Sequence, residues 1–173
     1  MNDRKPIFVS AAGRAALEQR LADKRQRHRD ICAEREVAHE LSGDGWHDNP
    51  HFNYLQQMEA NATREVMELE GLLGRTRVYE VLEGSRPTDR VAIGSVVTVL
   101  LVDEDSGEEH ERRFEIAGFQ ESDMATGKVG YNVPLAGRLL GLEVGDIATI
   151  ELPNGRYEVE VLDLAEDASG LGD

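Results

Sequence analysis

The sequence predicts an α+β protein in two parts. An N-terminal antiparallel α-helical coiled-coil hairpin is expected over residues 1–80, followed by a small β-rich domain over residues 81–173. Apolar residues recur at alternating spacings of four and three along two long segments before residue 77, which is typical of paired helices. After Gly84 the pattern changes to short runs rich in Val, Ile and Thr, separated by turn residues, which indicates strands.

Charge divides the chain in the same way. Residues 1–80 carry 12 basic and 14 acidic residues, a net charge of −2, whereas residues 81–173 carry 7 and 20, a net charge of −13. The total of −15 argues against a protein that wraps free duplex DNA. A single cysteine, Cys32, excludes an intrachain disulfide, and no apolar run has the roughly 18 residues of a membrane span. We therefore expect a cytoplasmic protein without membrane contact.

The first helix is expected from Ser10 to about Leu41. Ser10 is a good N-cap, and Gly13 weakens the first turn. The seam has a polar middle and consists of Leu17, Leu21, Lys24, His28, Ile31, Arg35 and Ala38. The cysteine beside this seam is expected to be a packed small hydrophobe.

The turn between the helices is expected over residues 42–50, where two glycines and a proline end the first helix. Asn49 and Pro50 are typical of an N-cap and a first helical residue, so a second helix is predicted from Pro50 to about Thr76. Its seam is Leu55, Met58, Ala62, Val66, Leu69 and Leu73. A compact helical bundle is the alternative, but it needs a third long helix, and none follows.

The β-rich part begins after the Gly84–Pro87 turn. The expected strands are 91–102, 108–119, 128–132, 147–152 and 157–164, with a short helix over 134–140 that begins at a proline and ends at a glycine. The sequence contains no nucleophile triad, P-loop or dinucleotide-binding fingerprint, so a small-molecule substrate is not expected.

This layout, together with three local motifs, resembles the bacterial transcript-cleavage factors GreA and GreB. Residues 9–21 (VSAAGRAALEQRL) are similar to the family's T-x-x-G-x-x-x-L entry to the first helix. Residues 43–50 (GDGWHDNP) resemble its tip, G-D-L-x-E-N-A-E-Y. The most specific match is residues 132–141 (NVPLAGRLLG), which resemble N-S-P-[IL]-[AG]-x-A-L-[IL]-G.

The resemblance implies an FKBP-like second domain that docks on RNA polymerase at the rim of its secondary channel, and a hairpin that enters the channel. It also implies that Asp44 and Asp48 help to hold a Mg²⁺ ion of the polymerase, which then hydrolyses the 3′ end of a backtracked RNA. The protein would not be an enzyme alone and would need no cofactor of its own. Mg²⁺ prefers carboxylate oxygen, which makes this role chemically reasonable.

The tip departs from the family pattern at its spacing. Asp44 and Asp48 are four residues apart, whereas the family's acids are three apart, and Trp46 and His47 lie between them. These two are candidate contacts with polymerase or a base, since indole stacks well. A non-cleaving regulator that occupies the secondary channel is therefore the alternative function, and turn formation is the alternative role of the two aspartates.

Two further interpretations remain at this stage. Lys24, Arg25, Arg27 and Arg29 form a basic cluster, which is either a solvated helix face or, as the resemblance implies, a contact for the RNA 3′ segment. A peptidyl-prolyl isomerase or chaperone is a more remote class, because residues 90–165 contain few aromatic residues for a proline pocket.

Overall fold

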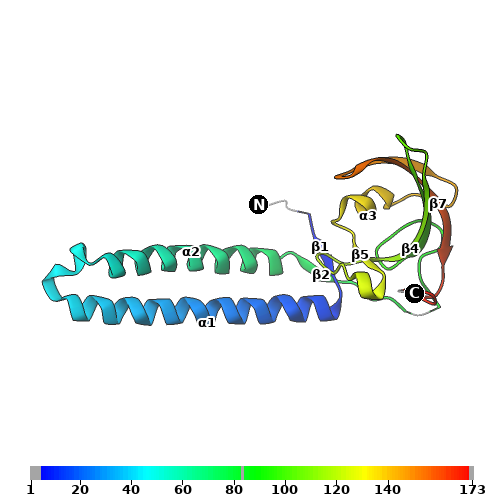
Figure 1. Ribbon diagram of the computed structural model, residues 1–173. Coiled ribbons are helices and arrows are strands. Elements are labelled where there is room, and N and C mark those ends of the chain that lie inside the picture. The colour runs from blue at the N-terminus through cyan, green and yellow to red at the C-terminus, as the bar shows by residue number, and fades with distance from the viewer. Residues whose placement is uncertain (1–4, 83, 172–173) are drawn as a thin grey trace. The chain divides into compact units, whose positions relative to one another are not determined.

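The computed structural model describes residues 5–82 and 84–171, without the side chains of Trp46 and His47. The chain forms two compact units, and the division falls after Thr76 (Figure 1). Residues 7–13 belong with the second unit, which a single boundary at residue 80 did not predict. In the described ranges, no helix is both long and apolar enough to cross a membrane. A helical hairpin followed by a curled β-sheet confirms the predicted fold class.

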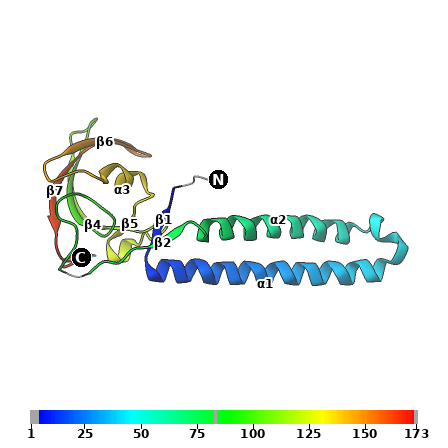
Figure 2. The same cartoon turned by 180° about the vertical axis from the view of Figure 1, so that it is seen from behind.

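The hairpin consists of α1 (Ala11–Ser42) and α2 (Pro50–Leu73), which lie antiparallel and side by side in both views (Figures 1 and 2). All the predicted seam residues of both helices are buried or partly buried. The second helix ends at Leu73 rather than near Thr76, because Gly74 follows and the chain then enters a strand. The heptad pattern thus predicted the buried face of each helix correctly.

Ion pairs between the helices accommodate the polar middle of the seam. Lys24 Nζ lies 2.6 Å from Glu65 Oε2, Arg25 Nη2 lies 2.6 Å from Glu70 Oε1, and Arg35 Nη1 lies 2.7 Å from Glu59 Oε2. The hydrogen bond and charge of Lys24 lower the pKa of Glu65. Such partly exposed pairs contribute little free energy each, about 0–1 kcal/mol, so they fix register more than they stabilise.

A two-stranded sheet that the sequence analysis missed pairs β1 (Ile7–Val9) with β2 (Thr76–Val78). The chain continues this pairing beyond the strands, because the Tyr79 amide donates to the Val9 carbonyl at 3.0 Å. Strands of three residues are too short to show a period of two, so the sequence pattern could not predict them.

The second unit contains a five-stranded sheet in the order β5-β4-β3-β7-β6. The bounds are β3 Val96–Asp103, β4 Glu109–Ala117, β5 Lys128–Gly130, β6 Ile147–Leu152 and β7 Gly155–Ala165. Neighbours are antiparallel except β4 and β5, which are parallel. A short 3₁₀ helix, η2 (Met124–Thr126), and α3 (Pro134–Leu139) complete the unit.

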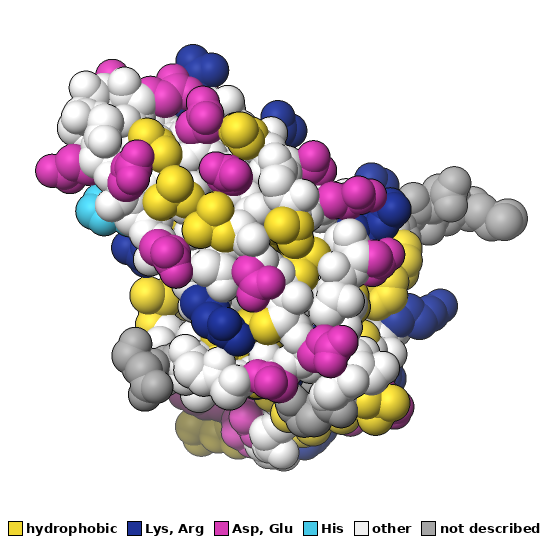
Figure 3. Space-filling view, turned by 90° about the vertical axis from the view of Figure 1, so that its right-hand side faces the viewer, with side chains coloured by type: hydrophobic (Ala, Val, Ile, Leu, Met, Phe, Trp, Pro, Cys, Tyr) yellow, Lys and Arg dark blue, Asp and Glu magenta, His cyan; other side chains and the backbone are white. Residues whose placement is uncertain are grey.

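The predicted strand over residues 91–102 was wrong at its start. Residues 91–95 form a turn, in which the Ser95 amide donates to the Ala92 carbonyl at 3.0 Å, and Gly94 has a φ of +94°. The apolar residues of this turn pack into the core instead: Val91 is 1% exposed and packs with the sheet and α3. Acidic side chains are spread over the face of the molecule seen in Figure 3, as the net charge of residues 81–173 leads one to expect.

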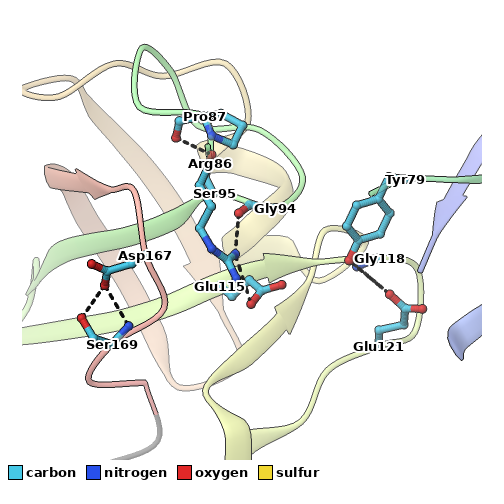
Figure 4. A network of polar contacts seen from close by, with 10 residues as sticks. All are labelled: Tyr79, Arg86, Pro87, Gly94, Ser95, Glu115, Gly118, Glu121, Asp167 and Ser169. Carbon is cyan, nitrogen blue, oxygen red and sulfur yellow. Dashed lines mark hydrogen bonds and ion pairs between the residues drawn. The ribbon is translucent and has the colours of Figure 1, made fainter. Parts of the chain in front are cut away.

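A buried ion pair connects the loop before β3 with β4. Arg86 Nη1 lies 3.3 Å from Glu115 Oε2 and donates to the Gly94 carbonyl at 2.8 Å (Figure 4). Both side chains are nearly inaccessible, at 4% and 9% exposed. Loss of one partner of such a buried ion pair leaves an unpaired buried charge, which costs much folding free energy. The pair therefore specifies the path of the loop.

The carboxylate of Glu121 gathers donors from three segments of the second unit. It accepts from the Ser10 hydroxyl at 2.7 Å, the Ser10 amide at 2.9 Å, the Gly118 amide at 3.0 Å and the Tyr79 hydroxyl at 3.4 Å. Figure 4 shows Tyr79, Gly118 and Glu121 together. A Cβ added to Gly13 would lie 1.5 Å from Glu121 Oε1, so Gly13 is needed for this approach. Ser10 also caps α1, since its hydroxyl accepts from the Gly13 amide at 3.0 Å.

Gly13→Ala should destabilise the protein by about 1–2 kcal/mol, although alanine is the better helix former. The new methyl group would displace the Glu121 carboxylate from its donors. The matched control is Gly71→Ala in α2, where an added Cβ meets no atom within 4 Å and should stabilise by about 0.5–1 kcal/mol. Urea unfolding measures both. In a Glu121→Ala background, Gly13→Ala should become stabilising; an unchanged cost there would contradict the account.

Stability should fall with rising pH because of Tyr79. Burial, followed by the negative charge of Glu121, raises the pKa of Tyr79 to about 12. The unfolded chain releases this proton near pH 10, so folding stability is complete below about pH 10 and is lost as the pH rises towards 12. Unfolding curves on either side of about pH 10 should show a smaller alkaline loss for Tyr79→Phe than for wild type. Equal losses would contradict this assignment.

Candidate functional site

The tip of the hairpin is a 3₁₀ helix, η1 (Gly43–Asp48), held between the ends of the two long helices. The Asn49 side-chain amide donates to the Ser42 hydroxyl at 2.6 Å, and that hydroxyl donates to the Ala38 carbonyl at 2.6 Å. The Asn49 Oδ1 accepts from the His51 amide at 2.9 Å, which confirms the predicted N-cap of α2. One asparagine thus closes the tip and begins the second helix.

An aromatic contact between α1 and α2 lies next to the tip. Phe52 is buried at 5% exposed, and its ring centroid lies 5.7 Å from that of His39. Sequence analysis missed Phe52, which lies three residues before Leu55, the first seam position that it did identify. The spacing of three was the available signal.

Both candidate carboxylates are exposed. Asp44 lies in the first turn of η1 and Asp48 at its end. With the described residues, neither makes a hydrogen bond or an ion pair, so their oxygens are available to a metal ion. A 3₁₀ helix has about three residues per turn, so positions four apart differ by about 120° around its axis, whereas positions three apart eclipse. The observed spacing therefore does not place the two residues on one face of η1.

Trp46 and His47 contribute backbone to η1, but their side chains lie outside the described part of the structure. Their proposed contacts with polymerase or nucleic acid stay predictions. His51, the next histidine, lies 3.4 Å from Glu34 Oε1 on α1, so it faces the other helix.

Two of the four residues in the basic cluster on α1 form ion pairs with acidic residues of α2, and the other two form none with the described residues. Lys24 and Arg25 bind Glu65 and Glu70 of α2. Arg27 makes no hydrogen bond or ion pair with the described residues, and Arg29 donates to Gln26. Of the four predicted RNA contacts, Arg27 and Arg29 thus keep the greater freedom to bind a phosphate.

The signature over residues 132–141 shapes the second unit. The Asn132 Oδ1 accepts from the amide of Gln120, a residue with a φ of +59°, at 2.9 Å. Pro134 begins α3, and Leu139 is 1% exposed in the core. A groove of about 360 Å³ runs beside this helix and is lined by Arg112, Arg113, Lys128, Leu135 and neighbouring residues. The groove, which Glu111 also lines, was not predicted from the sequence, because its arginines are separated from Lys128 in the chain.

The sequence comparisons identify one family. A family model described as "Transcription elongation factor, GreA/GreB, C-term" matches residues 86–166. Transcription elongation factor GreA of Chelativorans sp. (strain BNC1) is 31% identical over 156 residues, covering 90% of this chain and 95% of that protein. GreA of Mesorhizobium japonicum is 30% identical with the same coverage. A crystal structure of GreA factor homolog 1 (Gfh1) of Thermus thermophilus is 26% identical, with a TM-score of 0.37, and covers 93% of this chain and 99% of that one.

Asn49→Ala should destabilise the hairpin by about 1–2 kcal/mol, because it removes the cap of α2 and the bond to Ser42. Asp44→Asn and Asp48→Asn should change stability by about 0.5 kcal/mol or less, since both side chains are exposed. Thermal unfolding followed by circular dichroism at 222 nm, a helix signal, tests all three. A large loss in either aspartate variant would show that these carboxylates are structural.

Proposed function

Because the chain belongs to the GreA/GreB family of transcription elongation factors, we propose that it binds RNA polymerase at the secondary channel and stimulates cleavage of backtracked RNA. The hairpin enters the channel, and Asp44 and Asp48 contribute to a Mg²⁺ ion at the polymerase active centre. The second unit, for which an FKBP-like fold remains an expectation, docks at the channel rim.

The position of the two carboxylates supports this proposal most directly. They lie exposed at the end of a hairpin whose α1 has 32 residues, a length of about 48 Å at 1.5 Å per residue. Paired helices are stiff, and the Asn49–Ser42 bond fixes the turn that carries the acids. A narrow, stiff element with acidic residues at its tip suits delivery of carboxylates into a channel.

The chemistry requires oxygen ligands and water. Mg²⁺ takes six oxygen ligands and keeps several waters, so one or two added carboxylates can recruit it to an incomplete site. In two-metal hydrolysis the ions stabilise the attacking and leaving oxygens of the phosphodiester. On this account the protein supplies ligands and the polymerase supplies the reaction, so the protein needs no resident cofactor.

A second candidate function rests on the geometry of η1. The four-residue spacing turns Asp44 and Asp48 away from a common face. If one carboxylate cannot reach the ion, the hairpin would occupy the channel and restrict nucleotide addition without stimulating cleavage. Deletion of His47 would restore a spacing of three between the two aspartates. Cleavage by this variant but not by wild type would distinguish the non-cleaving function from the cleaving one.

The basic residues have a supporting role in this proposal. Arg27 and Arg29 would contact phosphates of the extruded RNA 3′ segment, because phosphate contacts position a nucleic acid irrespective of its sequence. Lys24 and Arg25 are held by acids of α2 and would contribute less.

Asp44→Asn and Asp48→Asn should each reduce RNA shortening in backtracked complexes at limiting Mg²⁺ by about tenfold or more, with polymerase affinity unchanged. Asp30→Asn, which removes an exposed carboxylate of α1 outside the tip, is the matched control and should cleave like wild type. The assay follows RNA length across a Mg²⁺ titration, with binding measured in parallel.

Three results of this assay are informative. Failure of the wild type to bind polymerase at micromolar concentration would reject the partner. Binding with slowed nucleotide addition and no shortening, together with cleavage by the variant that lacks His47, would favour the non-cleaving function. Equal cleavage by wild type and both aspartate variants would exclude carboxylate donation.

Arg27→Gln and Arg29→Gln should each weaken binding to backtracked complexes by about threefold. Lys24→Gln and Arg25→Gln should change this affinity little. The salt dependence of binding should also decrease for the first pair. Affinity at two salt concentrations is the measurement. A larger effect of the two paired residues would mean that their ion pairs open on binding.

A further inference from the structure

We infer that His28, Cys32 and Glu59 form a binding site for one thiophilic divalent cation of the Zn²⁺ class, in the middle of the helical hairpin. This site is independent of the proposed function. Cys32 lies about 15 Å along α1 from Ser42, the last residue before the tip, because ten positions separate the two. The ligands of this site include sulfur and nitrogen, which a Mg²⁺ site does not use.

The three side chains converge from both helices. His28 and Cys32 are four residues apart on α1, which places them on one face, and Glu59 comes from α2. One ligand atom from each lies within 4.8 Å of the others. The Cys32 Sγ is 3.8 Å from Nδ1 and 3.7 Å from Nε2 of His28. The sulfur and nitrogen ligands of a tetrahedral Zn²⁺ are about 3.6 Å apart, which is close to these distances. Because Sγ is nearly equidistant from both ring nitrogens, the imidazole must rotate to direct Nδ1 at an ion shared with the sulfur.

A further hydrogen bond orients the histidine. The Thr63 hydroxyl donates its one hydrogen to the Glu59 carbonyl at 2.9 Å. Its oxygen, 3.0 Å from His28 Nε2, must therefore accept from that nitrogen, which assigns the proton to Nε2. Nδ1 is left with a free lone pair beside the thiol. Metal-binding histidines characteristically donate their other ring N–H in this way.

Cys32 was expected from the sequence to pack as a small hydrophobic residue, but its neighbours are polar. Cys32 is half-buried between an imidazole and a carboxylate. Burial, followed by the negative charge of Glu59, raises the pKa of the Cys32 thiol. A bound divalent cation reverses this situation, because it stabilises the thiolate and releases the thiol proton to solvent. The thiolate and the carboxylate then balance the two positive charges of the ion.

Two other features are compatible with a bound ion. Arg35 Nη1 lies 2.7 Å from Glu59 Oε2, so one carboxylate oxygen can keep the arginine while the other binds metal. His28, Cys32 and Glu59 are each partly exposed, so solvent can reach the site directly. A water molecule from solvent would supply the fourth ligand of a tetrahedral ion.

The test is titration of the full-length reduced protein with Co²⁺, followed by competition with Zn²⁺. Because Cys32 is the one cysteine of the chain, a thiolate-to-cobalt charge-transfer band reports on this site alone. We expect one Co²⁺ per chain, displacement by Zn²⁺, and a higher melting temperature with metal, since the ion joins both helices. Light scattering should show that the chain does not dimerise on binding Zn²⁺.

Variants assign the ligands. Cys32→Ser should abolish the band, and Glu59→Gln should weaken Zn²⁺ binding at least about tenfold. Thr63→Val should weaken it about tenfold by releasing the imidazole. His110→Gln on β4 removes an exposed histidine of the other unit and should bind like wild type. Circular dichroism verifies that each variant is folded.

Three outcomes would overturn the inference. These are the absence of a charge-transfer band at stoichiometric Co²⁺, equal Zn²⁺ affinity of wild type and Cys32→Ser, and a band that appears only with dimerisation. The last would assign the metal to two chains joined through Cys32.

Discussion

The carboxylate of Glu121 is the constraint on which the two ends of the helical hairpin depend. It binds Ser10, directly before α1, and Tyr79, directly after β2, and it approaches so closely that a Cβ at position 13 would displace it. The same glycine would be a fault in an isolated helix, where it costs about 1 kcal/mol relative to alanine. Here it permits a four-donor cluster that holds together the places where the chain enters and leaves the hairpin.

Within the hairpin, apolar and polar segments of the seam have different tasks. Leu17 and Leu21 near the base, and Phe52 and Leu55 near the tip, bury apolar surface and provide the stability. In the middle, Ile31 and Ala62 remain buried. Around them, ion pairs and the polar group around Cys32 take the place of apolar seam residues. A continuous leucine seam would be more stable, but it would offer no site for a cation and no fixed register.

The sequence predicted the long-period features well and the short ones poorly. Two helical seams, the Asn49 cap and the α3 signature were predictable, because each repeats a pattern or follows a local rule. The role of Gly13 was not predictable, because it depends on Glu121, which is 108 residues away in the chain. The β1–β2 pair was missed because its strands are too short to show a period, and the start of β3 because the apolar residues before it form a turn that packs into the core. At the tip, the sequence identified the aspartates and their altered spacing. Their placement in a 3₁₀ helix, where the spacing changes the face, needed the structure.

Hydroxyl-radical mapping can show whether the tip of the hairpin reaches the metal ion of the polymerase. Fe²⁺ replaces Mg²⁺ in the active centre of a backtracked complex, and the radicals that it generates cut nearby backbone. We expect cuts in this chain at residues 43–50. These cuts should survive Asp30→Asn and weaken in Asp44→Asn with Asp48→Asn. Cuts confined to residues 81–173, or none at all in a complex shown to have formed, would contradict this expectation.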